Sequence, residues 1–270
     1  MGSGKKESFI LIVVEGKKLE PKIIDSINKN LQIFNNEQIK FCYETHIYDL
    51  YKRKRKEENK FKTLLSLLKE KKEQDESFKD IDDEQIVDRY LFFDHDVHHH
   101  DKDKETNIVE NNQKVKEMLE FFDTAGDKFK GKLYISYPMA EAIKDGENCD
   151  NCKLFHCYKT VYINDNKHYK ENIGCKSCYT DILNLTKQDW QHILTINWNR
   201  ANQLMKLYPN FVFSENSLMQ PIDSQQDIFY KQKIMCQKSN EVAVLSAFPL
   251  FILEYLNNEN KQKLIENLSK

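Results

Sequence analysis

The segment Phe9–Val14 is an unbroken run of apolar, mostly β-branched residues that ends at Glu15. A run without polar alternation is typical of a strand that is covered on both faces, as in a parallel sheet. Beyond Glu15, a polar turn leads to Pro21 and an amphipathic segment, which is the pattern of a helix start. The sequence therefore predicts a strand-turn-helix unit of an α/β fold, with Glu15 at the carboxyl end of a buried strand.

A second such run, Val87–Phe93, leads into Asp94-His95-Asp96. Side chains alternate along an extended chain, so Asp94 and Asp96 can point the same way and hold one divalent cation between them. Carboxylate oxygens favour Mg²⁺ or Mn²⁺. The simpler alternative is that the two acids only solvate a turn. Because sites in open parallel sheets form outside the carboxyl ends of the strands, we expect Glu15 to join this pair.

Two further strands complete the predicted sheet. Residues 39–48 alternate well enough to form the second strand, and residues 132–136 form the fourth. After the fourth strand, Pro138 is predicted to start a helix with Glu141 in its first turn. A carboxylate at this position either only complements the helix dipole or adds another acid to the site.

Two polar runs in the connections each have two interpretations. Residues 49–72 are predicted to form one long helix. The basic run 52–56 of this helix either binds phosphates or is a solvated helix face. The loop after Asp96 carries His98, His99 and His100, which either supply a ligand or proton-transfer group or are exposed loop residues.

The order and spacing of these motifs resemble those of a known family. Glu15-Gly16-Lys17-Lys18-Leu19-Glu20-Pro21 follows an apolar strand, and Asp94-x-Asp96 and Ser136-x-Pro138-x-x-Glu141 come after it. This set is similar to the Toprim nucleases of the RloB and overcoming-lysogenization-defect (OLD) type. The similarity covers about residues 9–145, roughly half of the chain.

The resemblance implies a Toprim-like parallel four-stranded sheet flanked by helices, and phosphodiester cleavage with a divalent metal ion, Mg²⁺ or Mn²⁺. Nothing in the sequence separates DNA from RNA as the substrate, and the near-neutral charge with small basic patches suggests a compact substrate such as tRNA. The resemblance also implies a link to bacterial anti-phage defence and to an ABC-type ATPase partner. Two positions depart from the family pattern: Tyr137 replaces the usual asparagine, and Ala140 replaces the usual aromatic residue. The match assigns no catalytic lysine. The implied catalytic residues are Glu15, Glu20, Asp94, Asp96 and Glu141, of which Glu15, Asp94 and Asp96 bind the metal.

The chemistry also requires a cation on physical grounds. Phosphodiester cleavage needs an attacking water that is made more acidic and a leaving oxygen whose charge is neutralised, and one or two divalent ions can do both. An acidic pocket without a cation would repel phosphate. We therefore expect a chelator to abolish activity.

Four cysteines form two C-x-x-C pairs, Cys149/Cys152 and Cys175/Cys178. This spacing suits tetrahedral Zn²⁺, and four thiolates close the coordination sphere, so the predicted zinc is structural. The aromatic and basic residues of the same insert either bind nucleic acid or only cover the zinc ribbon. Spare candidates for a ligand position are His156, Cys157 and His168.

The net charge, the apolar runs and the cysteines of the chain limit the class of protein. With Lys+Arg 41 against Asp+Glu 43, the net charge is -2, so a nucleic acid would have to be held by a local basic patch. No apolar run approaches the ~20 residues of a membrane span. The clustering of cysteines favours metal binding in a reducing compartment, the cytoplasm, over disulfides.

Three parts are predicted: a Toprim-like catalytic core at 8–145, a zinc-binding insert at 146–180, and a mainly helical C-terminal region at 181–270 that packs on the core. In the last part we predict helices from Thr186 and over Gln225–Lys238. The apolar run Val242–Leu256 is predicted to be a buried strand or helix pair, or a partner-binding surface if its apolar face is exposed.

Two functional hypotheses follow. The first is a metal-dependent nuclease that serves anti-phage defence and is gated by a partner. The alternative is a catalytically silent Toprim module that binds nucleic acid or an ABC-type ATPase. Nucleotidyl transfer, as in primases, is less favoured because no nucleotide site is recognisable, and the sequence leaves the oligomeric state open.

Overall fold

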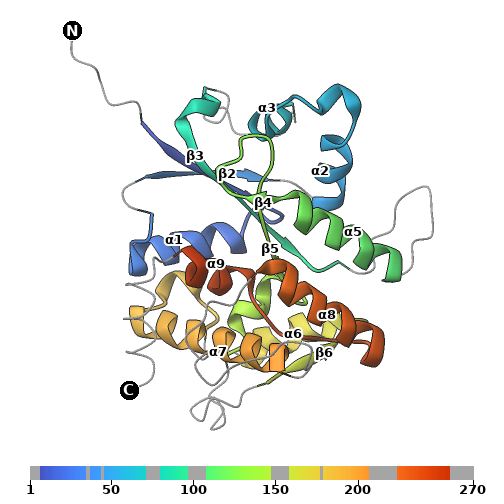
Figure 1. Ribbon diagram of the computed structural model, residues 1–270. Helices are drawn as coiled ribbons and strands as arrows, with labels where there is room; N and C mark the ends of the chain where they lie inside the picture. Colours follow the sequence, from blue (N-terminus) through green and yellow to red (C-terminus); the bar gives the residue numbers. More distant parts are fainter. Residues whose placement is uncertain are drawn as a thin grey trace.

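A computed structural model describes residues 7–34, 37–43, 46–70, 80–96, 108–146, 158–176, 179–206 and 224–255. Its centre is a five-stranded sheet with the order β2-β1-β3-β5-β4 (Figure 1). The first four strands run parallel, as the α/β prediction requires, and β4 pairs antiparallel with β5. The sheet thus has one strand more than the four predicted. The strands are β1 (Phe9–Val14), β2 (Gln38–Tyr43), β3 (Ile86–Asp94), β4 (Asp123–Thr124) and β5 (Gly131–Ser136).

The second strand is present but shorter than the predicted 39–48, and the prediction of one helix over 49–72 was wrong. The strand β2 ends at Tyr43, and the helical part is divided into α2 (Ile47–Lys54), the 3₁₀ helix η1 (Glu57–Asn59) and α3 (Leu64–Lys69). Side chains stabilise the break between α2 and α3. The buried ammonium of Lys54 donates to the carbonyl oxygens of Asn59, Lys60 and Lys62. The Thr63 hydroxyl then caps α3 by accepting from the Ser66 N–H.

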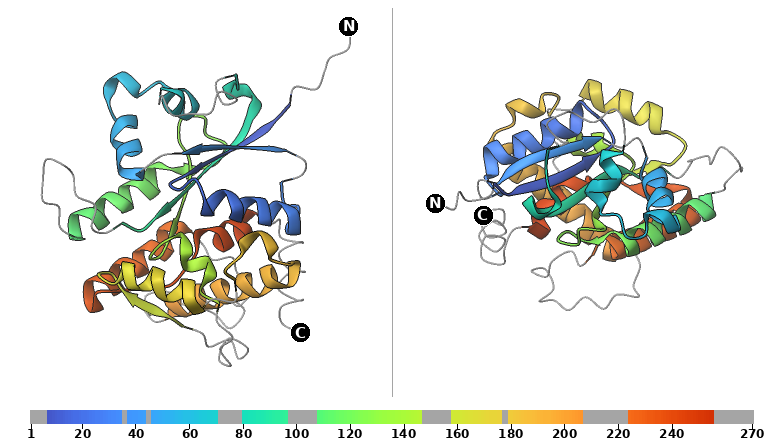
Figure 2. Two further views of the ribbon diagram at one scale, coloured as in Figure 1. Left: turned by 180° about the vertical axis from the view of Figure 1, so that it is seen from behind. Right: turned by 90° about the horizontal axis from the view of Figure 1, so that it is seen from above.

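Helices cover both faces of the sheet. Alternate residues of β1 point to opposite faces, so Leu11 and Val13 join one apolar core while Ile10 and Ile12 join the other. The first core is formed with α2, α3, α5 (Ile108–Phe121) and α8 (Gln225–Ser239). The second core is formed with α1 (Leu19–Leu31), α7 (Lys187–Lys206) and α9 (Ala247–Tyr255), which lie side by side in Figures 1 and 2.

The described segments beyond residue 146 are part of the same packed body. The strand β6 (Thr160–Tyr162), which precedes α6 (Asn166–Lys176), pairs antiparallel with β7 (Glu241–Ala243). Residues 242–256, predicted as a strand or helix pair, form the end of β7 followed by α9 in the described part. Pro249 lies in the first turn of α9, where an amide N–H has no partner within the helix. Both apolar cores therefore include residues from the C-terminal region.

A buried ion-pair network joins the parallel sheet unit to the later segments. Asp145, which follows the 3₁₀ helix η3 (Ala140–Lys144), lies 3.3 Å from the Arg200 guanidinium of α7 and 2.9 Å from the Lys159 ammonium. The hydroxyl of Tyr169, on α6, also donates to Asp145, at 3.0 Å. The side chains of Asp145 and Arg200 are each only 2% exposed. Because a buried charge needs a partner, these contacts fix the later segments relative to η3.

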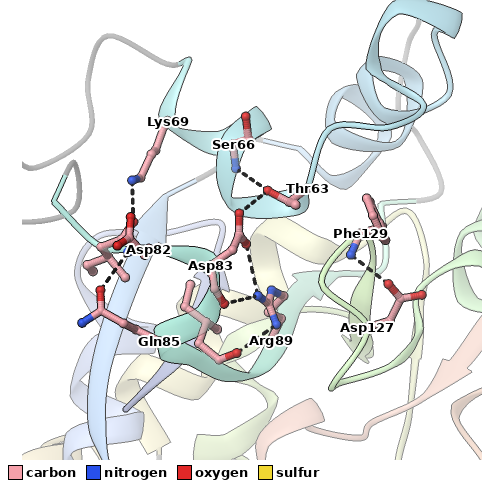
Figure 3. A network of polar contacts seen from close by, with 11 residues as sticks. Thr63, Ser66, Lys69, Asp82, Asp83, Gln85, Arg89, Asp127 and Phe129 are labelled. Atoms are coloured by element: carbon pink, nitrogen blue, oxygen red, sulfur yellow. Dashed lines mark hydrogen bonds and ion pairs between the residues drawn. The ribbon is translucent and has the colours of Figure 1, made fainter. Parts of the chain in front are cut away.

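Arg89 is a second buried cation, and its contacts lie toward the amino end of β3, opposite the end that the acids follow (Figure 3). The Arg89 guanidinium donates to the carboxylate and the carbonyl oxygen of Asp83, in the 3₁₀ helix η2 (Asp83–Gln85). Asp83 also accepts a hydrogen bond from Thr63, the cap of α3. This network lies toward the amino end of β3, so it is separate from the acids that follow the strand.

Candidate active site

Glu15 and Asp94 meet at the carboxyl edge of the sheet. Glu15 directly follows β1, Asp94 ends β3, and these strands are neighbours with Val14 paired to Phe92. The backbone N–H of Asp94 donates a hydrogen bond to the Glu15 carboxylate. The convergence predicted from the positions of the two strand ends is therefore present in the structure.

Burial and the charges of neighbouring acids raise the pKa of both carboxylates. Burial is the largest cause for Glu15, the charges of Asp96 and Glu20 add to it, and together they raise its pKa to about 7. The pKa of Asp94 is raised well above its ordinary value, first by burial and then by the charges of Glu15 and Glu141. The Ala140 N–H, which donates to Asp94, opposes this only in part. Hydrogen bonds from backbone N–H groups thus compensate the negative charge of these carboxylates only in part.

Glu20 is positioned by the turn between β1 and α1. Its carboxylate accepts a hydrogen bond from the Gly16 N–H at 2.7 Å, and the side chain is buried in the first turn of α1. A Cβ atom at Gly16 would lie 2.6 Å from the Glu20 carboxylate oxygen. The glycine therefore allows the glutamate to close back on the turn, which explains the Glu-Gly-x-x-x-Glu spacing physically.

Asp94, His95 and Asp96 have different surroundings. The His95 ring is buried, and its Nε2 lies 3.2 Å from the Asn112 Oδ1. The Asp96 charge acts on Glu15, and its carbonyl oxygen accepts a hydrogen bond from the Tyr48 hydroxyl at 2.8 Å. His95 thus anchors the segment in the protein, while the acids on either side of it act on the site.

Glu141 has a cationic partner that was not predicted from the sequence. The Lys170 ammonium, on α6, lies 2.6 Å from the Glu141 carboxylate. This contact raises the pKa of Lys170, and the charges of Asp94 and Glu20 raise it further. Lys170 is one of the basic residues of the insert, for which the sequence left open a role in binding nucleic acid. No local signal in the sequence shows that this segment folds back to the acids.

His46 is a second residue that was missed. Its Nδ1 lies 3.7 Å from the Glu15 carboxylate, and it occupies the N-cap position of α2 without a side-chain capping hydrogen bond. The sequence prediction placed it inside a strand, which hid its position at the start of a helix. Its place after β2, a neighbour of β1, was the available signal.

Other predicted positions need a correction or lie outside the described residues. Pro138 does not start a helix: η3 begins at Ala140, with Glu141 in its first turn. The backbone of Cys175 belongs to α6, but its side chain is not described. The remaining predicted positions outside the described residues are His98, His99, His100, Cys149, Cys152, His156, Cys157 and Cys178.

The acids suit a divalent cation in charge and in chemistry. A cation would relieve the repulsion that raises the pKa of Glu15 and Asp94, and carboxylate oxygens are the ligands that Mg²⁺ and Mn²⁺ prefer. In the described residues, no three His, Cys, Asp or Glu side chains are arranged so that they could hold a metal ion as they stand. Mg²⁺ usually keeps several waters and takes only one or two carboxylates directly, so three preformed ligands are not required.

Comparisons with known protein families, with curated proteins and with solved structures gave no match. Among the described helices, none combines the length and the apolar character that crossing a bilayer requires. Interpretation of the site therefore rests on its own geometry and charge.

Proposed function

We propose that this protein is a divalent-metal-dependent nuclease that hydrolyses phosphodiester bonds in nucleic acid. The observation that carries the proposal is the pair Glu15 and Asp94, two partly buried and repelling carboxylates at the ends of adjacent parallel strands. Asp96, Glu20 and Glu141 add negative charge around them. The proposed role in anti-phage defence and the proposed ABC-type ATPase partner rest on the family resemblance alone.

The proposed roles follow from the position of each acid. Asp94 and Asp96 would hold Mg²⁺ or Mn²⁺ together with Glu15. When bound, such a cation lowers the pKa of an attacking water and neutralises charge on the leaving oxygen. In the metal-free protein Glu15, whose pKa is about 7, gains and loses a proton near neutral pH, and a bound cation would hold its carboxylate in the ionised form.

Glu20 and Lys170 are proposed to position the site rather than to react. Glu20 accepts from the Gly16 N–H and so orients the turn that carries Glu15. Lys170 holds the Glu141 carboxylate beside Asp94. The site thus combines acids from the strand ends with one cation from a later helix.

We also propose a structural zinc held by Cys149, Cys152, Cys175 and Cys178. These thiolates lie in the chain between η3 and α7, and Cys175 belongs to the same helix as Lys170. A zinc bound there would help to fix the helix that carries Lys170. Metal analysis of the purified protein should give about one zinc per chain. Serine at both Cys175 and Cys178 should remove it, and zinc retained in that variant would contradict the assignment.

The test of the nuclease proposal is cleavage of plasmid DNA, single-stranded DNA and total tRNA in Mg²⁺, in Mn²⁺ and in EDTA. Wild type is compared with Asp94→Asn, Glu15→Gln and the matched control Asp123→Asn. Asp123 is exposed on β4 and pairs with Lys132 near the amino end of β5, away from the site. Cleavage should fall by on the order of 100-fold in both site variants and remain in the control.

Each contrary result has a definite meaning. Cleavage that persists in both site variants would show that the activity comes from another centre or from a contaminant. Binding of Mn²⁺ and of nucleic acid without cleavage by any form would favour the silent binding module. Equal loss in Asp123→Asn would indicate an effect on folding rather than on the site.

A further inference from the structure

A pocket of about 400 Å³ lies beside the acidic site, between α2 and α5. Its volume is within the range of small-molecule sites in proteins, so it can take a group the size of a nucleotide. Tyr48 and Tyr51 contribute aromatic rings, and the other lining residues are charged. The full lining is Tyr48, Asp49, Tyr51, Lys52, Arg55, Lys56, Lys114 and Glu117.

The pocket is positively charged although the whole chain is not. Four of its lining residues are cationic and two are acidic, whereas the chain carries a net charge of -2. Arg55 lies 3.8 Å from Glu117, and its guanidinium lies 5.4 Å from the centre of the Tyr51 ring. The Arg55 and Glu117 side chains are 59% and 41% exposed. An ion pair this exposed contributes little stability, so a polyanion can displace it at little cost.

The helix divides the basic run 52–56 into two groups. Lys52 lies in the last turn of α2, Arg55 is the C-cap of that helix and Lys56 follows it, and all three line the pocket. Arg53 instead donates to the Leu67 carbonyl oxygen at 2.7 Å, and the ammonium of Lys54 is buried among carbonyl oxygens. Arg53 and Lys54 hold the chain between α2 and α3. The other three line the pocket, where Arg55 is paired with Glu117 and Lys56 lies 3.9 Å from the exposed Glu58.

Tyr48 connects this pocket to the acidic site. Its side chain lines the pocket, while its hydroxyl donates to the carbonyl oxygen of Asp96. Two residues earlier, His46 lies against Glu15. From Tyr48 to Arg55 the helix rises by about 10 Å. A stacked strand advances by about 3.4 Å per nucleotide, so this length corresponds to about three nucleotides.

We propose that the pocket binds a single-stranded polynucleotide segment and leads it to the acids. Lysine and arginine would contact its phosphates, and the Tyr51–Arg55 pair offers a surface on which an unpaired base can stack. The inference rests on the proposed function in taking the acidic site as the place of cleavage. It adds the substrate class, an unpaired strand of DNA or RNA, and the residues that hold it.

The test is equilibrium binding of fluorescent 20-nucleotide oligonucleotides to Asp94→Asn protein in EDTA. The probes are oligo(dT), oligo(U) and a DNA duplex of equal length. The test variant replaces Lys52, Lys56 and Lys114 with glutamine. The control replaces Lys128, Lys187 and Lys238, which are exposed and lie outside the pocket lining. Each variant loses three positive charges, so the two variants have the same net charge.

We expect the pocket variant to bind single strands at least tenfold more weakly than the Asp94→Asn parent, and the control to bind within about twofold of it. Three lost phosphate contacts should also reduce the salt slope of single-strand binding by about 2. If both variants bind single strands equally weakly, the attraction depends on net charge alone, and the proposal that the pocket holds the strand is overturned. Tighter binding of the duplex than of either single strand would overturn the substrate class.

The nuclease proposal can fail separately from this inference. If wild type cuts nothing but binding depends on the three pocket lysines, the strand-binding role of the pocket is supported and the catalytic role of the acids is contradicted. If wild type cuts and the pocket variant binds like the control, the nuclease proposal is supported and the strand-binding role of the pocket is contradicted. Thermal unfolding of both variants identifies any loss caused by misfolding.

Discussion

The Lys170 ammonium and the Glu141 carboxylate lie 2.6 Å apart, which joins a helix of the cysteine-containing segment to the acids at the sheet edge. Lys170 is 62% exposed, so the contact contributes little to stability. Its charge nevertheless faces the place where we propose a cation binds. We therefore expect the pair to influence the proposed cation binding more than folding.

Replacing Lys170 with methionine should strengthen divalent-cation binding. The positive charge beside Glu141 disfavours a cation at the same acids, and at a partly exposed site its removal should increase affinity about two- to fivefold. Calorimetric titration with Mn²⁺ measures this, with Lys187→Met on α7 as the control. Weaker binding in Lys170→Met would contradict this prediction and would mean that the position in which Lys170 holds Glu141 matters more to cation binding than the charge of the ammonium.

Divalent-cation affinity should rise with pH around neutrality. A carboxylate must lose its proton to bind a metal, and the pKa of Glu15 is about 7 because of burial and neighbouring acids. From pH 6 to pH 8 its ionised fraction grows about tenfold, so Mn²⁺ affinity should grow by about the same factor. In Glu15→Gln the dependence over this range should be much flatter. A Glu15→Gln profile as steep as that of wild type would assign the titration to another group.

The metal-free protein should lose stability as pH rises through the range set by Glu15. Its ordinary pKa is 4.5 and its folded value is about 7, so between these values the folded state holds more protons than the unfolded state. The free energy of unfolding contributed by this group therefore falls from about pH 4.5 to about pH 7. The raised pKa of Asp94 acts in the same direction.

Urea unfolding in EDTA at pH 5 and pH 7.5 measures this loss. Glu15→Gln should reduce it, and Asp123→Asn should leave it unchanged. Added Mg²⁺ should restore stability at the higher pH, because binding to the folded state stabilises it. Stability that rises over this range by the same amount in wild type and Glu15→Gln would contradict the prediction.

Gly16→Ala should disturb the site without unfolding the protein. The added Cβ would lie 2.6 Å from a Glu20 carboxylate oxygen, so the carboxylate must leave its hydrogen bond to the backbone N–H. We expect a loss of about 1 kcal/mol in stability and at least a tenfold loss of cleavage. At Gly126, the matched control, the nearest atom to an added Cβ is 3.9 Å away. Gly126→Ala should keep full activity, and equal effects of the two substitutions would refute the role of Glu20.

Asp145→Asn should be strongly destabilising. Removal of its charge leaves the Arg200 guanidinium, 2% exposed, without its ionic partner. Breaking a buried pair in this way costs about 3–5 kcal/mol. The exposed Asp123→Asn substitution should change stability by less than about 0.5 kcal/mol. Urea unfolding provides both values, and a change in Asp145→Asn as small as that of the control would show that Arg200 finds another partner.

Local sequence patterns determined the centre of the molecule. The apolar runs at Phe9–Val14 and Val87–Phe93 predicted buried parallel strands, and both are central strands of the sheet. The acids at their ends were predicted to converge because strand direction fixes where carboxyl ends meet. An unbroken apolar run and the polar break after it are properties of a few adjacent residues, which is why the sequence reveals them.

Only the tertiary structure decided which distant groups complete the site. Lys170 contacts Glu141 because α6 folds back toward the sheet, and no periodicity in the sequence encodes that contact. The predicted long helix is broken after α2 because Lys54 satisfies carbonyl oxygens of the following turns, a role that only packing reveals.

The same packing divides the basic run 52–56, burying Lys54 and leaving Lys52 and Lys56 at the pocket. The sequence determined which charges are present. The fold decided which of them face carbonyl oxygens, which face carboxylates and which face solvent, because these choices depend on segments that lie far apart along the chain.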